Sequence, residues 1–268
     1  MRKDHGRCKI LHTTSNKLIP DAARLGNPSF VWRSGQERRL KIIQQHVKLK
    51  DQIILDLGCG VGEYVRAFSR EGGIAIGCDI EPSRVFEARE KSIQQENSKL
   101  TYLVAEGEKL PFLDNSLDIV VMNEVIEHVT NDQITLREIS RVLRYEGYCI
   151  IFAPNKLFPF ETHGIYIGKR YIFGNIPFIN WLPRTIRDKL VPHARVYGHQ
   201  DWPRLIANTD LKIIEHTYVY PGFDNLEKKW GLLGRIIRKA CYRAEKNWLQ
   251  RFGLSHFLIL VKKHKSNS

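Results

Sequence analysis

The segment with the clearest chemistry is a glycine-rich stretch that directly follows a short apolar run. Residues 53–57 are apolar apart from Asp56, and glycine then takes every second position at Gly58, Gly60 and Gly62. An apolar run that glycines interrupt is typical of a buried parallel strand followed by a loop. Because glycine has no side chain, the backbone of this loop can approach a ligand closely. The pattern predicts a ligand-binding loop between a strand and a helix.

A second acid follows at a spacing that indicates a nucleoside. Asp79 closes another apolar run, about twenty residues after Asp56, where a carboxylate can accept hydrogen bonds from the ribose hydroxyls. The third glycine stands one position too early for a dinucleotide fingerprint, and Glu63 follows it. A carboxylate there repels phosphates and suits a cation. This argues against an NAD-dependent oxidoreductase and leaves a plain tight turn as the structural alternative.

The run Asp-x-Gly-x-Gly-x-Gly resembles the first motif of the class I S-adenosylmethionine-dependent methyltransferases, whose ligand carries a sulfonium and an ammonium group. Residues 105–112 resemble the family's third motif, in which an acid commonly bonds the adenine amino group; Glu106 stands where aspartate is usual. Residues 123–129 resemble the fourth motif in its Glu-His-Val variant. Residues 110–118 match the Leu-Pro-Phe-x-Asp-x-Ser-x-Asp pattern of methyltransferases that act in quinone and lipid biosynthesis.

The resemblance covers residues 36–155 and implies both a fold and a cofactor. The implied fold is α/β, a Rossmann-like doubly wound sheet of seven strands, mostly parallel with an antiparallel last strand. The implied cofactor is S-adenosylmethionine. The predicted cofactor-binding residues are Asp56, Gly58, Cys59, Gly60, Gly62, Asp79, Ile80, Glu106, Gly107, Asn123 and Glu124. Asn123 and Glu124 follow a predicted strand, where open α/β sheets bind ligands; Glu127 and His128 are interpreted as bracing that turn.

The elements that must position these residues alternate between strand and helix, as in a parallel sheet covered on both faces. The predicted strands are 53–57, 74–80, 100–105, 117–123, 147–153, 212–220 and 257–263. A capping box at 34–37 predicts the start of a leading helix, and a Thr-x-x-Gln sequence at 130–133 predicts the start of a later one.

Four segments are expected along the chain. Residues 1–48 form an N-terminal cap and helix, whose residues 30–33 either line the cofactor pocket or only pack on the surface. Residues 49–155 form the S-adenosylmethionine-binding core, and residues 156–200 form a substrate lid. Residues 201–268 complete the core and carry a basic amphipathic insertion at 223–255.

The lid segment has the residues that could activate an acceptor. It is irregular and rich in aromatic residues, proline, glycine and histidine, and a long insertion of this kind is usually functional. A structural flap with its own small core is the alternative. A hydroxyl acceptor needs a base, and His163 is predicted as that base with Glu161 orienting it; His193 and His199 are alternatives. No metal is predicted, because no cluster of carboxylates follows the fourth strand.

The net charge of +13 favours an anionic partner, although a basic surface that only aids solubility is the alternative. In 223–255, apolar residues share a helical face among many lysines and arginines, which is typical of a membrane-surface helix; packing on the sheet and RNA binding stay open. The cysteines form no C-x-x-C pair, and the sequence shows neither a secretory signal nor an apolar run that could span a bilayer. We expect a cytoplasmic, membrane-associated protein.

The leading hypothesis is therefore an S-adenosylmethionine-dependent methyltransferase that methylates an oxygen of a lipophilic or aromatic small molecule, or of a lipid, at a membrane surface. An RNA methyltransferase and a non-catalytic S-adenosylmethionine-binding protein are the alternatives. The sequence gives no indication of oligomeric state.

Overall fold

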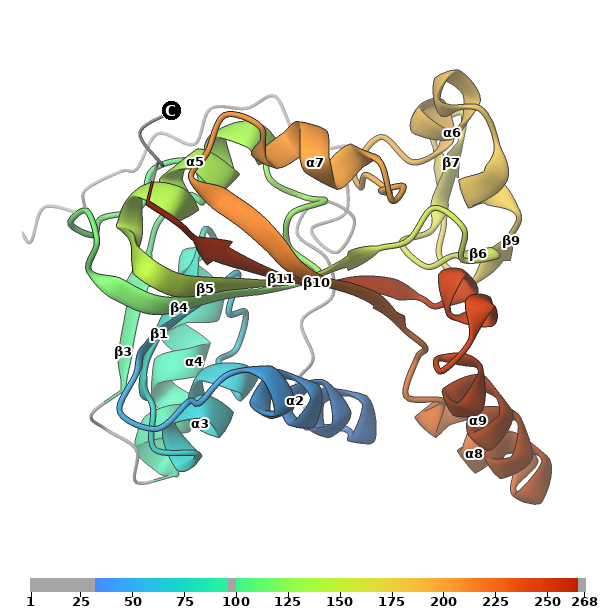
Figure 1. The fold of residues 1–268 in the computed structure, drawn as a ribbon. Helices are drawn as coiled ribbons and strands as arrows, with labels where there is room; N and C mark the ends of the chain where they lie inside the picture. Colours follow the sequence, from blue (N-terminus) through green and yellow to red (C-terminus); the bar gives the residue numbers. More distant parts are fainter. Residues whose placement is uncertain (1–31, 96–99, 265–268) are drawn as a thin grey trace, which may run out of the picture.

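Seven strands form one sheet in the order β10-β11-β5-β4-β1-β2-β3 (Figure 1). The structure is a computed structural model that describes residues 32–95 and 100–264, so the predicted cap over residues 1–31 lies outside the described residues. The strands are β1 (Ile53–Leu57), β2 (Ile74–Asp79), β3 (Thr101–Val104), β4 (Leu117–Asn123), β5 (Leu143–Pro154), β10 (Leu211–Val219) and β11 (Ser255–Lys262). Only β11 is antiparallel to its neighbours in this sheet, which confirms the predicted fold class.

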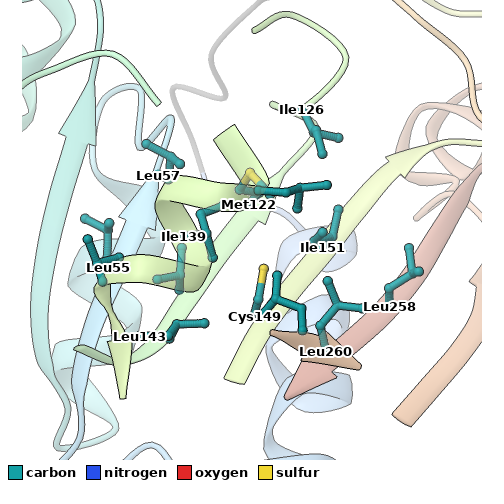
Figure 2. Close-up of a cluster of buried hydrophobic side chains, with 14 of the residues drawn as sticks. Leu55, Leu57, Met122, Ile126, Ile139, Leu143, Cys149, Ile151, Leu258 and Leu260 are labelled. Atoms are coloured by element: carbon teal, nitrogen blue, oxygen red, sulfur yellow. The ribbon is translucent and has the colours of Figure 1, made fainter. Parts of the chain in front are cut away.

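Helices cover both faces of the sheet. The helices α2 (Ser34–His46), α3 (Glu63–Arg70) and α4 (Pro82–Gln94) lie on one face, and α5 (Asp132–Val142) and α7 (Asp201–Ile206) lie on the other (Figure 1). Successive strand residues point to opposite faces. In β1, Ile54 therefore packs with Ile43 of α2, whereas Leu55 packs with Ile139 of α5. Figure 2 shows this second cluster, to which β4, β5 and β11 also contribute.

Two helix starts differ from the prediction by one residue. The first helix is capped at Arg33, whose backbone N–H donates to the Gln36 side chain; the hydroxyl of Ser34 instead bonds Asp224 of α8 (Asp224–Trp230). The α5 helix is capped by Asn131, which accepts from the Ile134 N–H at 3.0 Å. Asparagine is a better N-cap than threonine, so Asn131 displaces the expected Thr130.

Other boundaries shift where packing overrides the local pattern. The β5 strand begins at Leu143, four residues before the predicted start, because Leu143 pairs with Leu117 of β4.

The lid is ordered and builds its own small sheets. It contains β6 (Phe160–Glu161), β7 (Ile165–Ile167), β8 (Arg170–Ile172), β9 (Ile176–Pro177), the 3₁₀ helix η1 (Ile179–Trp181) and α6 (Arg184–Leu190). Strands β6 and β9 form one two-stranded sheet, and β7 and β8 form another. A small buried cluster of Ile165, Val191 and Ala194 supports them. The lid is therefore structured, where the sequence predicted an irregular segment.

The basic insertion is a helical hairpin and not one continuous helix. It consists of α8, α9 (Leu232–Ala244) and the 3₁₀ helix η2 (Trp248–Phe252). The break falls at Gly231, whose φ of 53° and ψ of −116° suit glycine. A Cβ atom on Gly234 would lie 2.7 Å from the carbonyl oxygen of Leu226, so glycine also permits the close contact of α8 with α9.

No helix within the described residues is long and apolar enough to cross a membrane. The four cysteines in this part of the chain are free thiols, and Cys59, Cys78 and Cys149 are buried in the sheet region, as the sequence predicted.

Candidate active site

The loop between β1 and α3 depends on its three glycines. Gly58, Gly60 and Gly62 have φ values of 75°, 53° and 79°, in the left-handed region that favours glycine. Asp79, at the end of β2, holds this loop in place. One of its carboxylate oxygens accepts from the Gly60 N–H at 2.8 Å, and the other accepts from the Glu81 N–H at 3.0 Å. Each oxygen keeps a second lone pair for a ligand hydroxyl, so Asp79 both shapes the loop and can accept from a ribose.

Acidic groups surround the loop and favour a cationic ligand. Burial, and then the charge of Asp79, raise the pKa of Asp56 to about 8. A positive ligand group nearby would relieve this cost, whereas a phosphate would increase it. Glu63 lines the adjacent cavity, but its carboxylate also bonds Arg66 at 2.9 Å, so part of its charge is neutralised inside the protein.

A cavity of about 470 Å³ opens beside this loop. The predicted residues that line it are Cys59, Gly60, Asn123, Glu124 and His163. Asn123 is notable because both polar atoms of its amide are buried without a hydrogen-bond partner among the described residues. A buried amide normally has such partners. Its donor and acceptor therefore fit a polar ligand in the cavity.

Glu124 lies at the junction of the sheet, α2 and β11. Its φ of 54° is unusual for a residue other than glycine, and such backbone strain clusters at functional sites. Its carboxylate accepts from Arg39 and from the Ser255 hydroxyl, each at 2.5 Å. Burial alone would raise the pKa of Glu124, but the charge of Arg39 and these hydrogen bonds lower it.

The sequence reasoning missed Arg39 as a residue of the site. Arg39 comes from α2 and, with Arg33 and Gln36, lines the cavity. The sequence contained a signal for this role. Gln36 and Arg39 are three residues apart, so they share a helix face, and they adjoin the buried Leu40 and Ile43. One prediction for residues 30–33 was that they line the pocket, and Arg33 does so. Residues 30 and 31 lie outside the described residues.

Three further predicted cofactor residues, Ile80, Glu106 and Gly107, are not part of the cavity lining. Ile80 is half-exposed just after β2, and Glu106 is exposed in the turn after β3, with Gly107 beside it. Arg141 of α5 fixes the next part of this turn by donating to the carbonyl oxygens of Leu110 and Phe112 at 3.0 and 2.8 Å. In this structure the Leu-Pro-Phe pattern therefore stabilises the turn after β3, through the carbonyl groups that bond Arg141.

The lid brings the predicted catalytic pair together at the cavity. His163 Nδ1 lies 2.8 Å from a Glu161 carboxylate oxygen, and Arg187 of α6 donates to the other oxygen at 2.8 Å. Burial would raise the pKa of Glu161, but its hydrogen bond with His163 and the positive charges of His163 and Arg187 lower it to about 2.

The protonation of His163 bears directly on its predicted role. Burial would lower its pKa, but contacts with Glu127 and Glu161 raise the pKa to about 10. A histidine that keeps its proton at neutral pH is a weak general base, so this role for His163 stays a prediction. Burial lowers the pKa of the neighbouring His128, which therefore stays neutral. The alternatives His193 and His199 have different partners. His193 Nε2 donates to the carbonyl oxygen of His163, and His199 stacks on His216.

Comparison with known proteins gives a consistent result. Residues 55–151 match a family model described as a methyltransferase domain. An uncharacterised methyltransferase of Mycobacteroides abscessus is 33% identical over 138 residues, 52% of each chain. A ubiquinone biosynthesis O-methyltransferase of Coxiella burnetii is 29% identical over 139 residues, 52% of this chain and 58% of the relative. The chain thus matches only about half the length of these curated relatives.

Solved structures show the same fold. An S-adenosylmethionine-dependent methyltransferase from Mesorhizobium loti superposes with a TM-score of 0.57 at 14% identity, covering 85% of this chain and 98% of the other. The fold is Rossmann-like, and the acidic surroundings of the glycine loop suit a cationic nucleoside. Residues 55–151 match a methyltransferase domain, and in this domain and in its fold the chain resembles the class I S-adenosylmethionine-dependent methyltransferase family. S-adenosylmethionine is the cofactor of this family, and the unpaired Asn123 amide and the acids around the loop fit it.

Proposed function

We propose that this protein transfers the methyl group of S-adenosylmethionine to an oxygen atom of a lipophilic or aromatic small molecule at an anionic membrane surface. The observation that carries the proposal is the continuous cavity from the glycine loop to the aromatic lid. Methyl transfer from a sulfonium is an in-line displacement, so the protein mainly aligns donor and acceptor. The O-methyltransferase relative from Coxiella burnetii supports oxygen as the acceptor atom.

The lid supports an apolar acceptor. Tyr171 and Phe173 line the cavity at its lid side. Phe173 is 64% exposed, and Phe178 and Trp181 nearby in the chain are also exposed. Aromatic side chains around a cavity mouth suit an acceptor with a flat or hydrocarbon body.

The hairpin offers a surface suited to a membrane. We define the hairpin surface as the exposed apolar side chains of Trp230, Leu232, Leu233, Ile236 and Trp248. Exposed basic residues lie among them in the sequence, including Arg235, Lys239 and Arg243. An exposed apolar face with neighbouring positive charges suits an interface with anionic lipids.

The hairpin is tethered to the core through its other face. Arg38 of α2 forms an ion pair with Glu245 and lies 4.1 Å from the ring centroid of Tyr242. Glu245 also accepts from the Tyr220 N–H at 2.7 Å. The hairpin and the lid project from the same end of the sheet (Figure 1), and residues of both lie at the cavity: Phe173 from the lid and Asp224 from α8. This arrangement supports entry of a lipophilic acceptor from a bound membrane.

Cofactor binding and methyl transfer are tested together on the purified chain. Calorimetry should detect binding of S-adenosylmethionine and of S-adenosylhomocysteine. Incubation with phenolic lipids from a cell extract should yield S-adenosylhomocysteine and a product heavier by one methylene group. Binding without any turnover would favour the non-catalytic alternative, and turnover only with RNA would favour the RNA alternative.

The membrane part has its own test and control. Vesicles of phosphatidylcholine with phosphatidylglycerol should co-sediment the protein, and the double variant Leu232→Glu, Ile236→Glu should reduce this binding at least about tenfold. The control is Phe86→Glu, since Phe86 is equally exposed but lies on α4. Equal binding by the double variant would end the membrane proposal and leave methyl transfer untouched.

A further inference from the structure

Glu127 has a buried carboxylate whose surroundings are unusual. It lies in the turn after β4 and is 1% exposed. Neither of its carboxylate oxygens has a hydrogen-bond partner among the described residues. Burying an unpaired carboxylate is costly, so such groups in proteins are paired or coordinate a metal. The side-chain atoms that face Glu127 are therefore informative.

Two histidine nitrogens face the same carboxylate oxygen. His128 Nε2 lies 3.9 Å and His163 Nε2 lies 3.8 Å from Glu127 Oε1. Both distances are longer than a hydrogen bond. The three groups offer ligand atoms that all lie within 4.8 Å of one another. The two rings meet edge-on, with centroids 5.3 Å apart.

The hydrogen bonds of both histidines leave these nitrogens available. His128 Nδ1 lies 3.0 Å from the carbonyl oxygen of His193. A carbonyl only accepts, so Nδ1 carries the hydrogen and, in the neutral ring, Nε2 has the lone pair. His163 Nδ1 similarly donates to Glu161 at 2.8 Å. Metal-binding histidines usually donate their second ring N–H to a carbonyl or carboxylate in this way.

We propose that Glu127, His128 and His163 bind a divalent transition-metal ion of the zinc or iron(II) type. Two imidazole nitrogens and one carboxylate oxygen are a ligand set that these ions take, with positions left for water or substrate. Tetrahedral zinc with bonds of about 2.0–2.1 Å needs ligand atoms about 3.4 Å apart. The observed 3.8 and 3.9 Å are about half an ångström longer than this, and all three ligand atoms lie within 4.8 Å of one another, so the side chains would have to draw together around the ion.

The surroundings give the site a rigid outer layer and an open side. Glu161, which orients His163, is held by Arg187, and both are about 1% exposed. His128 and His163 line the cavity. A metal ion here would therefore present its open positions to the space proposed for the acceptor. Without an ion, a proton on His163 is the alternative charge partner of Glu127, and metal binding would displace it.

The site stands on geometry, whereas its role in the reaction rests on the proposed function. A bound divalent ion lowers the pKa of a coordinated hydroxyl. The acceptor O–H would lose its proton to water, and its oxygen would attack the methyl carbon. The carbon–sulfur bond of the donor would break with the electron pair remaining on sulfur, which gives neutral S-adenosylhomocysteine. The sequence predicted no metal because no cluster of carboxylates follows the fourth strand. The grouping of Glu127 with two histidines leads us to revise that expectation.

The test is a Zn²⁺ titration of the chelator-stripped, full-length protein. Calorimetry should give one Zn²⁺ per chain, and Co²⁺ should give the visible absorption of nitrogen and oxygen coordination. Glu127→Gln, which preserves size, should weaken Zn²⁺ binding at least about 100-fold, and Glu161→Gln about 10–100-fold through its effect on His163. The control Glu138→Gln, which alters a carboxylate bonded to Arg141 on α5, should bind Zn²⁺ normally.

Stoichiometric binding lost in Glu127→Gln, with the variant's circular dichroism unchanged, would support the site. Absence of stoichiometric binding in the native chain, or equal affinity in Glu127→Gln, would overturn it. The metal site and the proposed reaction can be disproved separately. Methyl transfer that persists in chelator, together with no Zn²⁺ binding, would disprove only the metal site. Zn²⁺ binding without turnover would disprove only the proposed reaction.

Discussion

The core sheet and the lid are stabilised by different kinds of interaction. The sheet buries apolar side chains on both faces, in two extensive clusters. The lid has only three buried apolar residues in its cluster, and a buried ion pair between Arg187 and Glu161 joins α6 to β6. Apolar burial is non-directional and tolerates change, whereas a buried ion pair depends on both partners. We therefore expect one polar substitution in the lid to have a large local effect.

The largest effect is expected in the lid, where removal of the buried ion pair tests this comparison. Arg187→Ala breaks the buried ion pair with Glu161 and leaves this carboxylate only His163 as a cationic partner, which should cost about 3–5 kcal/mol of local stability. Hydrogen exchange should rise across residues 160–195 and stay unchanged in β1, β4 and β5. The control Arg184→Ala lies on the same helix, but its pair with Asp201 is 60% exposed on the arginine side and should cost at most about 1 kcal/mol. Equal effects of the two variants would contradict the comparison.

The next effect separates ligand binding from stability within the core. Asp79→Ala removes the acceptor of the Gly60 and Glu81 N–H groups and should weaken S-adenosylmethionine binding about 100-fold. The matched control is Asp118→Ala, since Asp118 also accepts from a backbone N–H, that of Ile53 at 2.8 Å, at the start of β4. The control should lower the melting temperature but leave affinity unchanged. Calorimetry and thermal denaturation distinguish the two outcomes.

The stability of the folded chain should depend on pH through Asp56 in the acidic loop. The pKa of Asp56 is about 8 in the folded chain, well above its ordinary value of 3.8. Between these values the folded chain binds more protons than the unfolded chain, so the stability from this group falls as pH rises towards 8. From pH 6 to pH 7 the loss approaches about 1.4 kcal/mol.

Asp56→Asn keeps this position uncharged at every pH. The variant should lose that part of the pH slope and gain stability over the native chain at pH 7, as measured by urea denaturation at pH 6 and pH 7. An identical slope in both proteins would mean that Asp56 is ionised in the folded state.

The smallest effect concerns the cap of α5. Asn131→Ala should lower the free energy of unfolding by about 1 kcal/mol, because it removes the acceptor of the Ile134 N–H. Thr130→Ala, at the position that the sequence favoured, should be nearly neutral. For a chain of this size, urea denaturation resolves the difference better than a shift of a few degrees in melting temperature. A larger loss in Thr130→Ala would restore the sequence-based cap.

The core was predictable because each strand is an apolar run with a clear break after it. Glycines follow β1, Asp79 closes β2 shortly before Pro82, and Asn123 closes β4, so local sequence marks both the strand and its functional end. The cap positions were missed by one residue because neighbouring polar side chains compete for the same N–H groups. The lid strands have only two or three residues, which is too short for a periodic pattern.

The site was only partly predictable, because its second half depends on tertiary contacts. Glu161 and His163 are two residues apart and were paired from the sequence. Glu127 and His128 come from the turn after β4, and no local pattern relates them to His163 in the lid. Arg187 is likewise joined to Glu161 only by the fold of α6 onto β6. A Glu-His pair followed by a histidine after the next strand was the available signal.

The position of β11 has a consequence for biosynthesis. This strand lies between β5 and β10, yet it follows the lid and the hairpin in the sequence. While the ribosome is still making these insertions, β5 has an open edge of unpaired backbone groups, and such edges promote aggregation. The nascent sheet is completed only when residues 255–262 emerge, so both insertions are exposed to the cell before the sheet that anchors them is closed.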